Sequence, residues 1–366
     1  MAKNSSKKPL NKKQKRQIKL ILLKILLIFL IVLCTAVIGV VIVFHHYYSK
    51  MNIDKGNIDM VTTEFVEEDI DPNATDSDAD LILSVDEQLK QNLEDSSTEL
   101  MFSDNVYNIL LIGNDSRDKN TLGRSDSMII VSINKSTKEI ILTSIMRDSY
   151  VYIPGHWNTR INAAYALGGP DLLIETIETN FKVKIDSYVA VNFFSFMDAV
   201  DAVGGVEIEV SNAEANVLNT YIAELNYLEG LPEGTDMLYG GGTYKLNGKQ
   251  ALAYSRIRYV GNADFDRTGR QREVLEKMMN SMRTASLSEL NNVLNVVLPQ
   301  VTTDISEGEM FTLLLDTTTT YKDYAIKQYR VPYDGTYQNL TIDGAAVLGL
   351  DLMTNINYLH RDIYGD

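Results

Sequence analysis

The chain has 366 residues, of which 45% are apolar and 23% charged, and its formal net charge is −15 at pH 7. This length and composition are typical of a folded chain that holds an anchor and one large domain, or two smaller domains. The single cysteine, Cys34, excludes an intramolecular disulfide, and four scattered histidines give no pattern for a zinc site.

The first 50 residues predict one membrane anchor. Residues 1–24 form a basic tail without acidic groups, and ILLIFLIVLCTAVIGVVIVF (25–44) is free of charge. A helix of that length crosses a hydrocarbon core, whereas a cleaved signal peptide would have a shorter apolar region and an Ala-x-Ala end. Basic flanks stay in the cytoplasm, so a single-pass type II topology is expected, with the rest of the chain outside.

The segment 45–104 is acidic and predicts an extracellular stalk. Residues 51–104 hold 16 acidic and two basic groups, a composition typical of solvated, partly disordered chain. LILSVDEQLKQNLEDS (81–96) is compatible with a short amphipathic helix or with an unfolded segment. Beyond residue 50 the net charge is −25, and so acidic a surface repels nucleic acid, so no nucleic-acid partner is expected.

Residues 105–366 alternate predicted strands and helices, which indicates one layered α/β domain around a central sheet. Short apolar runs that end in turn residues predict strands at 106–113, 127–134, 139–146, 187–193, 206–210 and 323–332. Helical spacing of apolar residues predicts helices at 161–181 with a restart after Pro170, at 194–205, at 271–285 and at 344–364.

RIRYVGNADFDRTGRQR (256–272) holds five of the 13 arginines of this acidic chain. Guanidinium forks match carboxylate and phosphate oxygens, so the segment predicts either an ion-pair network or a site for a small, highly charged anion. Arg256 and Arg258 would point to one side of a strand. Further along, the spacing of Arg267, Arg270, Gln271 and Val274 places them on one face of a helix. This face starts polar and turns apolar, as a charged mouth above an apolar cavity would require.

Aspartates and arginines also flank the predicted strands upstream. Asp115 follows the strand at 106–113, Asp126 precedes the next strand, and Arg147 follows the third. Ligands of open α/β sheets bind outside the carboxyl ends of strands, so these side chains are expected to meet. Asp115 and Asp126 are suited to share Mg²⁺, which prefers carboxylate and phosphate oxygens. No Gly-x-Ser-x-Gly elbow or Walker loop indicates acyl hydrolysis or nucleotide binding.

Six motifs, in order along residues 106–280, resemble the LytR-CpsA-Psr family: YNILLIGNDSR, GRSDSMIIVSINKSTKEIILTSIMRDSYVYIPG, RINAAYALGGP, VNFFSFMDAVDAVGGVEIEV, LNGKQALAYSRIR and DFDRTGRQREVL. The resemblance implies a layered α-β-α domain with a central mixed sheet and a hydrophobic tunnel for a polyprenyl tail. It also implies a magnesium-dependent phosphotransferase that moves a glycopolymer from undecaprenyl pyrophosphate onto peptidoglycan, outside the cell membrane of a Gram-positive bacterium.

The resemblance further implies the roles of individual residues. Asp115 and Asp126 would hold Mg²⁺ or Mn²⁺. The expected catalytic residues are Asp126, Arg124, Arg147 and Asp264, and the residues expected to bind the pyrophosphate are Arg147, Arg256, Arg258, Arg267, Arg270 and Gln271.

Two other functions use the same residues. A polyprenyl-pyrophosphate phosphatase would use water as the acceptor, and a non-catalytic envelope regulator, or transcription attenuator, would bind without turnover. The polymer itself stays open among teichoic acid, capsule and other wall glycans.

Overall fold

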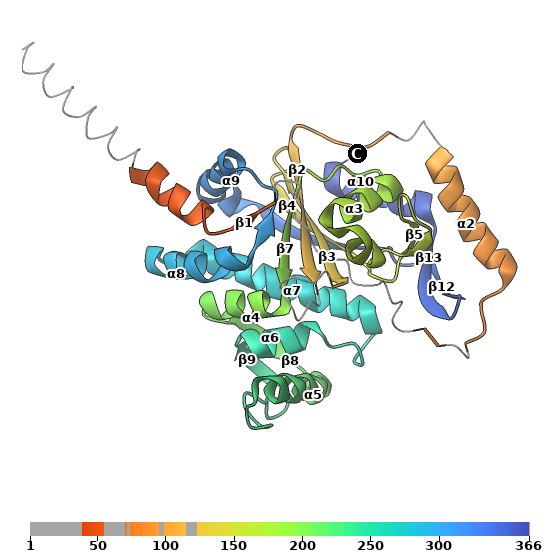
Figure 1. The fold of residues 1–366 in the computed structure, drawn as a ribbon. Coiled ribbons are helices and arrows are strands. Elements are labelled where there is room, and N and C mark those ends of the chain that lie inside the picture. Colours follow the sequence, from red (N-terminus) through yellow and green to blue (C-terminus); the bar gives the residue numbers. More distant parts are fainter. Residues whose placement is uncertain (1–38, 55–69, 72–73, 95–98, 115–122, 366) are drawn as a thin grey trace, which may run out of the picture. The chain divides into compact units, whose positions relative to one another are not determined.

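The computed structural model describes residues 39–54, 70–71, 74–94, 99–114 and 123–365 (Figure 1). The chain divides into two compact units, Met1–Ser49 and Lys50–Asp366. Residues 39–48 of the first unit are helical, whereas the basic tail and most of the expected membrane span lie outside the described residues. Among the helices that are described, none combines the length and hydropathy that a membrane crossing requires. The anchor therefore stays a prediction.

A seven-stranded mixed sheet organises the second unit, in the order β1-β10-β7-β2-β3-β4-β11. β3 runs antiparallel to both neighbours, β2 and β4, while β2 is parallel to β7 and β4 is parallel to β11. The carboxyl ends of β2, β4, β7 and β11 therefore share one edge with the start of β3. The strands are β1 (Asn52–Ile53), β10 (Thr302–Thr303), β7 (Ser187–Asn192), β2 (Val106–Asn114), β3 (Ser125–Asn134), β4 (Glu139–Ile145) and β11 (Ala325–Val331).

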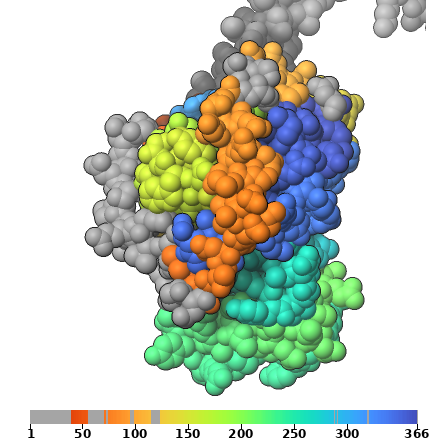
Figure 2. All heavy atoms as spheres, turned by 90° about the vertical axis from the view of Figure 1, so that its right-hand side faces the viewer, coloured from red at the N-terminus to blue at the C-terminus, as the bar shows by residue number. Residues whose placement is uncertain are grey.

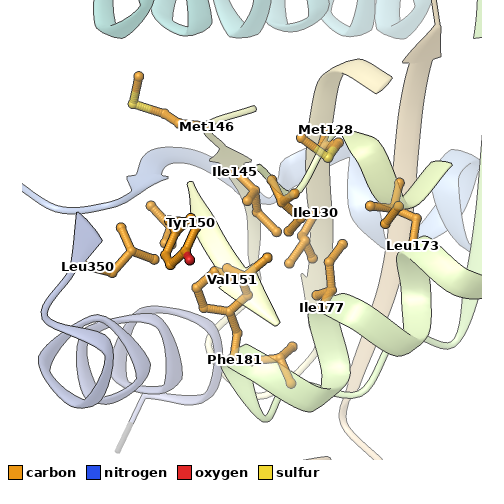
Figure 3. Packing of buried hydrophobic residues seen from close by; sticks show 14 of the residues in the cluster. Met128, Ile130, Ile145, Met146, Tyr150, Val151, Leu173, Ile177, Phe181 and Leu350 are labelled. Atoms are coloured by element: carbon orange, nitrogen blue, oxygen red, sulfur yellow. The ribbon is translucent and has the colours of Figure 1, made fainter. Parts of the chain in front are cut away.

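Helices cover both faces of this sheet, because apolar residues along β3 alternate between two hydrophobic clusters. Met128 and Ile130 pack toward one face and Ile129 and Ile133 toward the other. Figure 3 shows side chains of β3, β4 and α3 pointing toward one another in the larger cluster. The first face carries α2 (Ala79–Glu94), α3 (Ala163–Phe181) and α10 (Leu352–Tyr364), and the second carries α7 (Ala263–Thr284) and α9 (Glu307–Thr319). The predicted layered α/β class is confirmed.

A smaller lobe follows β7 and has its own apolar core. The antiparallel strands β8 and β9, between which α5 lies in the chain, pack on α4, α5 and α6, and Val274 of α7 joins this core. Their bounds are α4 (Phe193–Ala202), β8 (Val206–Val210), α5 (Asn212–Glu229), β9 (Gly242–Leu246) and α6 (Gly248–Ser255). The helix α8 (Leu287–Val297) lies against α4. Outside this lobe, the short antiparallel pair β5 (Tyr150–Tyr152) and β6 (Asn158–Arg160) follows β4 in the chain.

The N-terminal boundary of this domain differs from the expected start at residue 105. Residues 79–94 form α2, whose Val85 and Leu89 are buried in the larger core. Figure 2 shows α2, in orange, lying between α3 and the C-terminal segments. β1 also pairs with β10. The acidic composition predicted a stalk because the charged residues of α2 lie mostly on its outer side, while Ile82, Val85 and Leu89 recur at helical spacing on the inner side.

One helix prediction was wrong in its first third. Residues 345–350 form a strand, β13 (Ala345–Leu350), paired with β12 (Tyr337–Ile342), and only then does α10 begin. The turn between the two strands is Asp343-Gly344, and both residues have positive φ, 50° and 76°. Asp-Gly is a strong hairpin signal, which could have identified this turn from the sequence.

Candidate functional site

Asp126 and Arg147 meet at the edge of the sheet where β3 starts and β4 ends. The antiparallel pairing of these strands brings Arg147 Nη1 to 2.7 Å from Asp126 Oδ1. Burial opposes ionisation of the Asp126 carboxyl, but the charges of Arg147, Arg267 and Arg258 outweigh it and lower the pKa of Asp126. Asp126 is therefore a carboxylate at neutral pH, and its second oxygen, Oδ2, has no hydrogen-bond partner within the described residues.

The first turns of α7 add a second ion-pair group. Asp264 Oδ1 lies 3.0 Å from Arg267 Nη1 and 3.4 Å from Arg258 Nε. Arg267 is 3% exposed, and its Nε has no hydrogen-bond partner in the described part of the chain. Burial, together with Arg147 and Arg258, lowers the pKa of Arg267 to about 10, although Asp264 opposes this shift. A buried guanidinium with an unused donor is suited to bind an anion.

These groups surround a cleft of about 260 Å³. Arg256 forms one wall of this cleft. Its guanidinium carbon lies 4.7 Å from the ring centroid of Tyr221 and 5.6 Å from that of Phe193. Its Nη2 lies 3.2 Å from a carboxylate oxygen of Glu224. The cleft is lined by Asp126, Ser127, Phe193, Tyr221, Ser255, Arg256, Arg258, Tyr259, Arg267 and Gln271. Three arginines against one aspartate make this lining electropositive within an acidic domain.

Gln271 fixes the distance between α7 and the sheet. Its side-chain carbonyl accepts a hydrogen bond from the Ser127 hydroxyl of β3 at 3.1 Å. The residue was predicted to bind pyrophosphate, and the structure places it on the cleft wall. The contact with Ser127 uses only the carbonyl oxygen, so the Gln271 side chain holds the helix in place and still has an amide donor to offer a ligand.

The structure separates Arg270 from the other expected ligands. Arg270 donates to Glu214 at 2.9 Å and to the backbone carbonyls of Ile257 and Val260, each at 3.1 Å. It therefore stabilises the segment that carries Arg256 and Arg258, and it does not line the cleft. The expected grouping was wrong here because helical spacing alone cannot distinguish the cleft side of α7 from the neighbouring side.

Three further predictions have different outcomes. Arg256 and Arg258 were expected on a strand, but they lie in the irregular chain that follows α6. The capping box of Asn247 and Gln250 could have identified that helix. Arg124 is buried just before β3. Asp115 lies outside the described residues, and its role stays a prediction.

Asp148 is a partly buried carboxyl that was not among the expected site residues. It lies 3.5 Å from Arg147 Nε and 3.9 Å from Arg160, and burial together with Asp264 raises its pKa. Asp148 and Asp264 lie at the wall of a second cavity of about 330 Å³. Most of the remaining lining is apolar, with Met146, Phe265, Tyr337, Leu340, Ala346, Val347 and Leu348. An apolar cavity thus adjoins the arginine cleft across Asp264.

No group of three or more His, Cys, Asp or Glu side chains is arranged to hold a metal ion in the part of the chain that the structure describes. Asp126 alone supplies a described carboxylate at the cleft. Its ionised state and unused oxygen fit a hard cation that completes its shell with phosphate oxygens.

The LytR_cpsA_psr family model matches residues 74–357. A polyisoprenyl-teichoic acid–peptidoglycan teichoic acid transferase, TagU, of Oceanobacillus iheyensis is 39% identical over 217 residues, which is 57% of this chain and 62% of that protein. Biofilm regulatory protein A of Streptococcus mutans is 33% identical over 69% of this chain and 61% of its own length. These alignments thus cover less than two thirds of either relative. TagU of Bacillus anthracis is 32% identical over 72% of this chain and 81% of its own.

Solved structures share the fold. TagT bound to LI-WTA superposes with a TM-score of 0.57 at 26% identity and covers 72% of this chain and 93% of its own. YwtF (TagT) with bound octaprenyl pyrophosphate lipid gives 0.51 at 25% identity, with the same coverage. Because the family model spans well over half of the sequence, the chain belongs to the LytR_cpsA_psr family.

Proposed function

We propose that this chain is a membrane-anchored, extracellular phosphotransferase that moves an anionic glycopolymer from undecaprenyl pyrophosphate onto peptidoglycan. The observation that carries the proposal is Arg267, a buried arginine with an unused Nε donor on the wall of an arginine-lined cleft. A pyrophosphate supplies the negative charge that this cleft lacks, and the guanidinium groups bind its oxygens bidentately.

The apolar cavity beside Asp264 supports a lipid-linked donor. With the pyrophosphate between Arg258 and Arg267, the first isoprene units of the tail reach the cavity lined by Met146, Leu340 and Val347. Burying these units removes apolar surface from water. The names of the relatives, a teichoic acid transferase and a protein with bound octaprenyl pyrophosphate, favour the same substrate class.

Each residue then has a separate task in the transfer. Arg256, Arg258 and Arg267 position the pyrophosphate and stabilise the charge on its oxygens, which is most of what phosphoryl transfer requires. Asp264 orients Arg258 and Arg267. The attacking group is a hydroxyl of the wall glycan, whose oxygen bonds to the phosphorus that bears the polymer while the polyprenyl phosphate leaves. Asp126 and Asp264 are the carboxylates near enough to the cleft to accept the hydroxyl proton.

We assign Asp126, with Asp115, to hold a divalent cation, Mg²⁺ or Mn²⁺. When bound, the cation neutralises charge on the phosphate oxygens. Arg147 keeps Asp126 ionised and fixes the direction of its carboxylate.

The expected anchor determines where the reaction takes place. A cytoplasmic tail (1–24) and a membrane span (25–44) hold the domain at the outer face of the cell membrane of a Gram-positive bacterium, next to a membrane-bound donor. The uncharged 20-residue run behind a basic cluster supports this topology.

The proposal is tested with the full chain, magnesium, a labelled polyprenyl-pyrophosphate glycan and peptidoglycan fragments. Wild type should transfer label to the peptidoglycan fraction, Arg267→Ala should not, and Arg283→Ala, an exposed arginine of the same helix, should match wild type. Release of polyprenyl phosphate without labelled peptidoglycan would instead indicate a pyrophosphatase. No turnover by wild type, together with tight binding of the donor, would indicate a regulator.

A further inference from the structure

Arg272 is a buried arginine that the proposed reaction does not use. It is 8% exposed and lies on a different face of α7 from Arg267 and Gln271. Its Nη1 donates to the Ser144 hydroxyl at 2.7 Å and its Nε donates to the Gln328 side chain at 3.2 Å. Both partners are neutral, so no carboxylate compensates this buried charge among the described residues.

A second arginine increases the local positive charge. Arg330 of β11 lies over the ring of Phe265, 4.4 Å from its centroid, and pairs with Asp334, whose side chain is 90% exposed. Water screens such an exposed partner strongly. Burial and the charge of Arg330 lower the pKa of Arg272 to about 10. A bound anion would relieve both costs, since it would supply the missing opposite charge.

Both arginines line a groove of about 620 Å³ on the side of α7 away from the arginine cleft, here called the lateral groove. Each of its four acidic side chains already has a partner in the described chain: Glu214 with Arg270, Glu273 with the Tyr254 hydroxyl, Asp266 with the amide of Asn262, and Asp334 with Arg330. Glu214 and Asp334 pair with arginines, whereas Glu273 and Asp266 accept hydrogen bonds from neutral donors and keep their negative charge. An anion is therefore expected only directly beside Arg272, whose own partners are neutral.

Gly269 gives the anion access to Arg272. A Cβ atom built at Gly269 would lie 4.0 Å from Arg272 Nη2 and would touch nothing nearer. Gly269 lines the lateral groove, so the missing side chain leaves open space in front of this guanidinium nitrogen.

We propose that Arg272 and Arg330 form a second anion subsite in the lateral groove, which binds a phosphodiester group of the anionic glycopolymer. This rests on the proposed function. A phosphodiester has two unesterified oxygens, one for each arginine, and teichoic acids, which the relatives transfer by name, repeat this group along the chain. The subsite would hold the polymer beside the cleft in which its pyrophosphate end reacts, which raises the effective concentration of that end.

The test measures equilibrium binding of a lipid-free poly(glycerol phosphate) oligomer to the full chain, with inorganic pyrophosphate saturating the arginine cleft. Gly269→Glu places a carboxylate beside Arg272, and Gly269→Gln is the matched neutral control. Both variants replace a helical glycine, so neither is expected to impair folding. We expect Gly269→Glu to weaken oligomer binding about tenfold, as the loss of charged hydrogen bonds predicts, and Gly269→Gln to change it by less than about threefold.

Several outcomes would overturn the inference. Equal binding by the two variants would exclude the subsite, and so would no binding of the oligomer by wild type. Displacement of the oligomer by a muramyl peptide, but not by glycerol phosphate, would assign the subsite to an acceptor carboxylate instead. A separate measurement of pyrophosphate binding distinguishes a failure of the lateral subsite from a failure of the proposed function. Arg267→Met should lose pyrophosphate binding and keep oligomer binding, whereas Gly269→Glu should keep pyrophosphate binding and lose oligomer affinity.

Discussion

Replacing Arg267 with methionine should stabilise the ligand-free protein while abolishing its binding of pyrophosphate. A pKa lowered from 12.5 to about 10 corresponds to a cost of about 3 kcal/mol for holding this charge in its buried position. Methionine removes that cost and fills the same space, but Asp264 then keeps only Arg258, at 3.4 Å. We therefore expect a net gain of about 1–3 kcal/mol, or a melting temperature about 2–6 °C higher.

The assay is thermal unfolding of the full chain with and without inorganic pyrophosphate and magnesium. Wild type should melt at a higher temperature with the ligand, because binding to the native state stabilises it. Arg267→Met should start higher and gain little, since its affinity for pyrophosphate should fall at least about tenfold. Arg283→Met, the same change at an exposed position of α7, should shift stability by less than about 0.5 kcal/mol. A variant less stable than wild type that still binds pyrophosphate would refute the reasoning.

Three further predictions concern the cleft, the domain boundary and acid stability. Asp126→Asn should lower transfer of labelled glycan at least about 100-fold, and activity within threefold of wild type would contradict its role. Leu89→Ala in α2 should lower the free energy of unfolding, measured with denaturant, by about 2–4 kcal/mol, whereas Leu83→Ala at an exposed position should lower it by less than about 0.5 kcal/mol. Equal effects would exclude α2 from the core. Burial opposes ionisation of Glu214, but its helix-cap hydrogen bonds and the Arg270 ion pair lower its pKa below 4.5. The ionised Glu214 carboxylate therefore stabilises the fold fully above pH 4.5, and this stabilisation is lost as the pH falls through the lower pKa of the folded state. The melting temperature of Glu214→Gln should consequently decline less below pH 4.5 than that of wild type.

The central strands could be predicted from their runs of apolar residues, because strands that are buried on both faces require such runs. Ile109 to Ile112 and Met128 to Val131 are apolar on both faces because helices cover both sides of the sheet. The segment 345–350 failed because its small apolar residues also suit a helix, and only the pairing with β12 makes it a strand.

The sequence predicted which residue types form the site, but it did not predict which side chains of α7 point into the cleft. The strand order brings Asp126 to Arg147, as the loop positions suggested. Which arginine of α7 faces the cleft depends on the rotation of the helix, and that is set by Gln271 on Ser127 and by Val274 in the smaller core. The sequence alone carries no measure of that rotation, so Arg270 was grouped with Arg267.

The start of α7 contributes to three cavities at once. Arg267 and Gln271 face the cleft, Asp264 faces the apolar cavity, and Gly269 and Arg272 face the lateral groove. Successive residues of a helix are about 100° apart, so one inserted or deleted residue here would turn every later side chain to the wrong cavity. Variation in chain length should therefore be confined to the loop before Ala263, while α7 itself changes only by substitution.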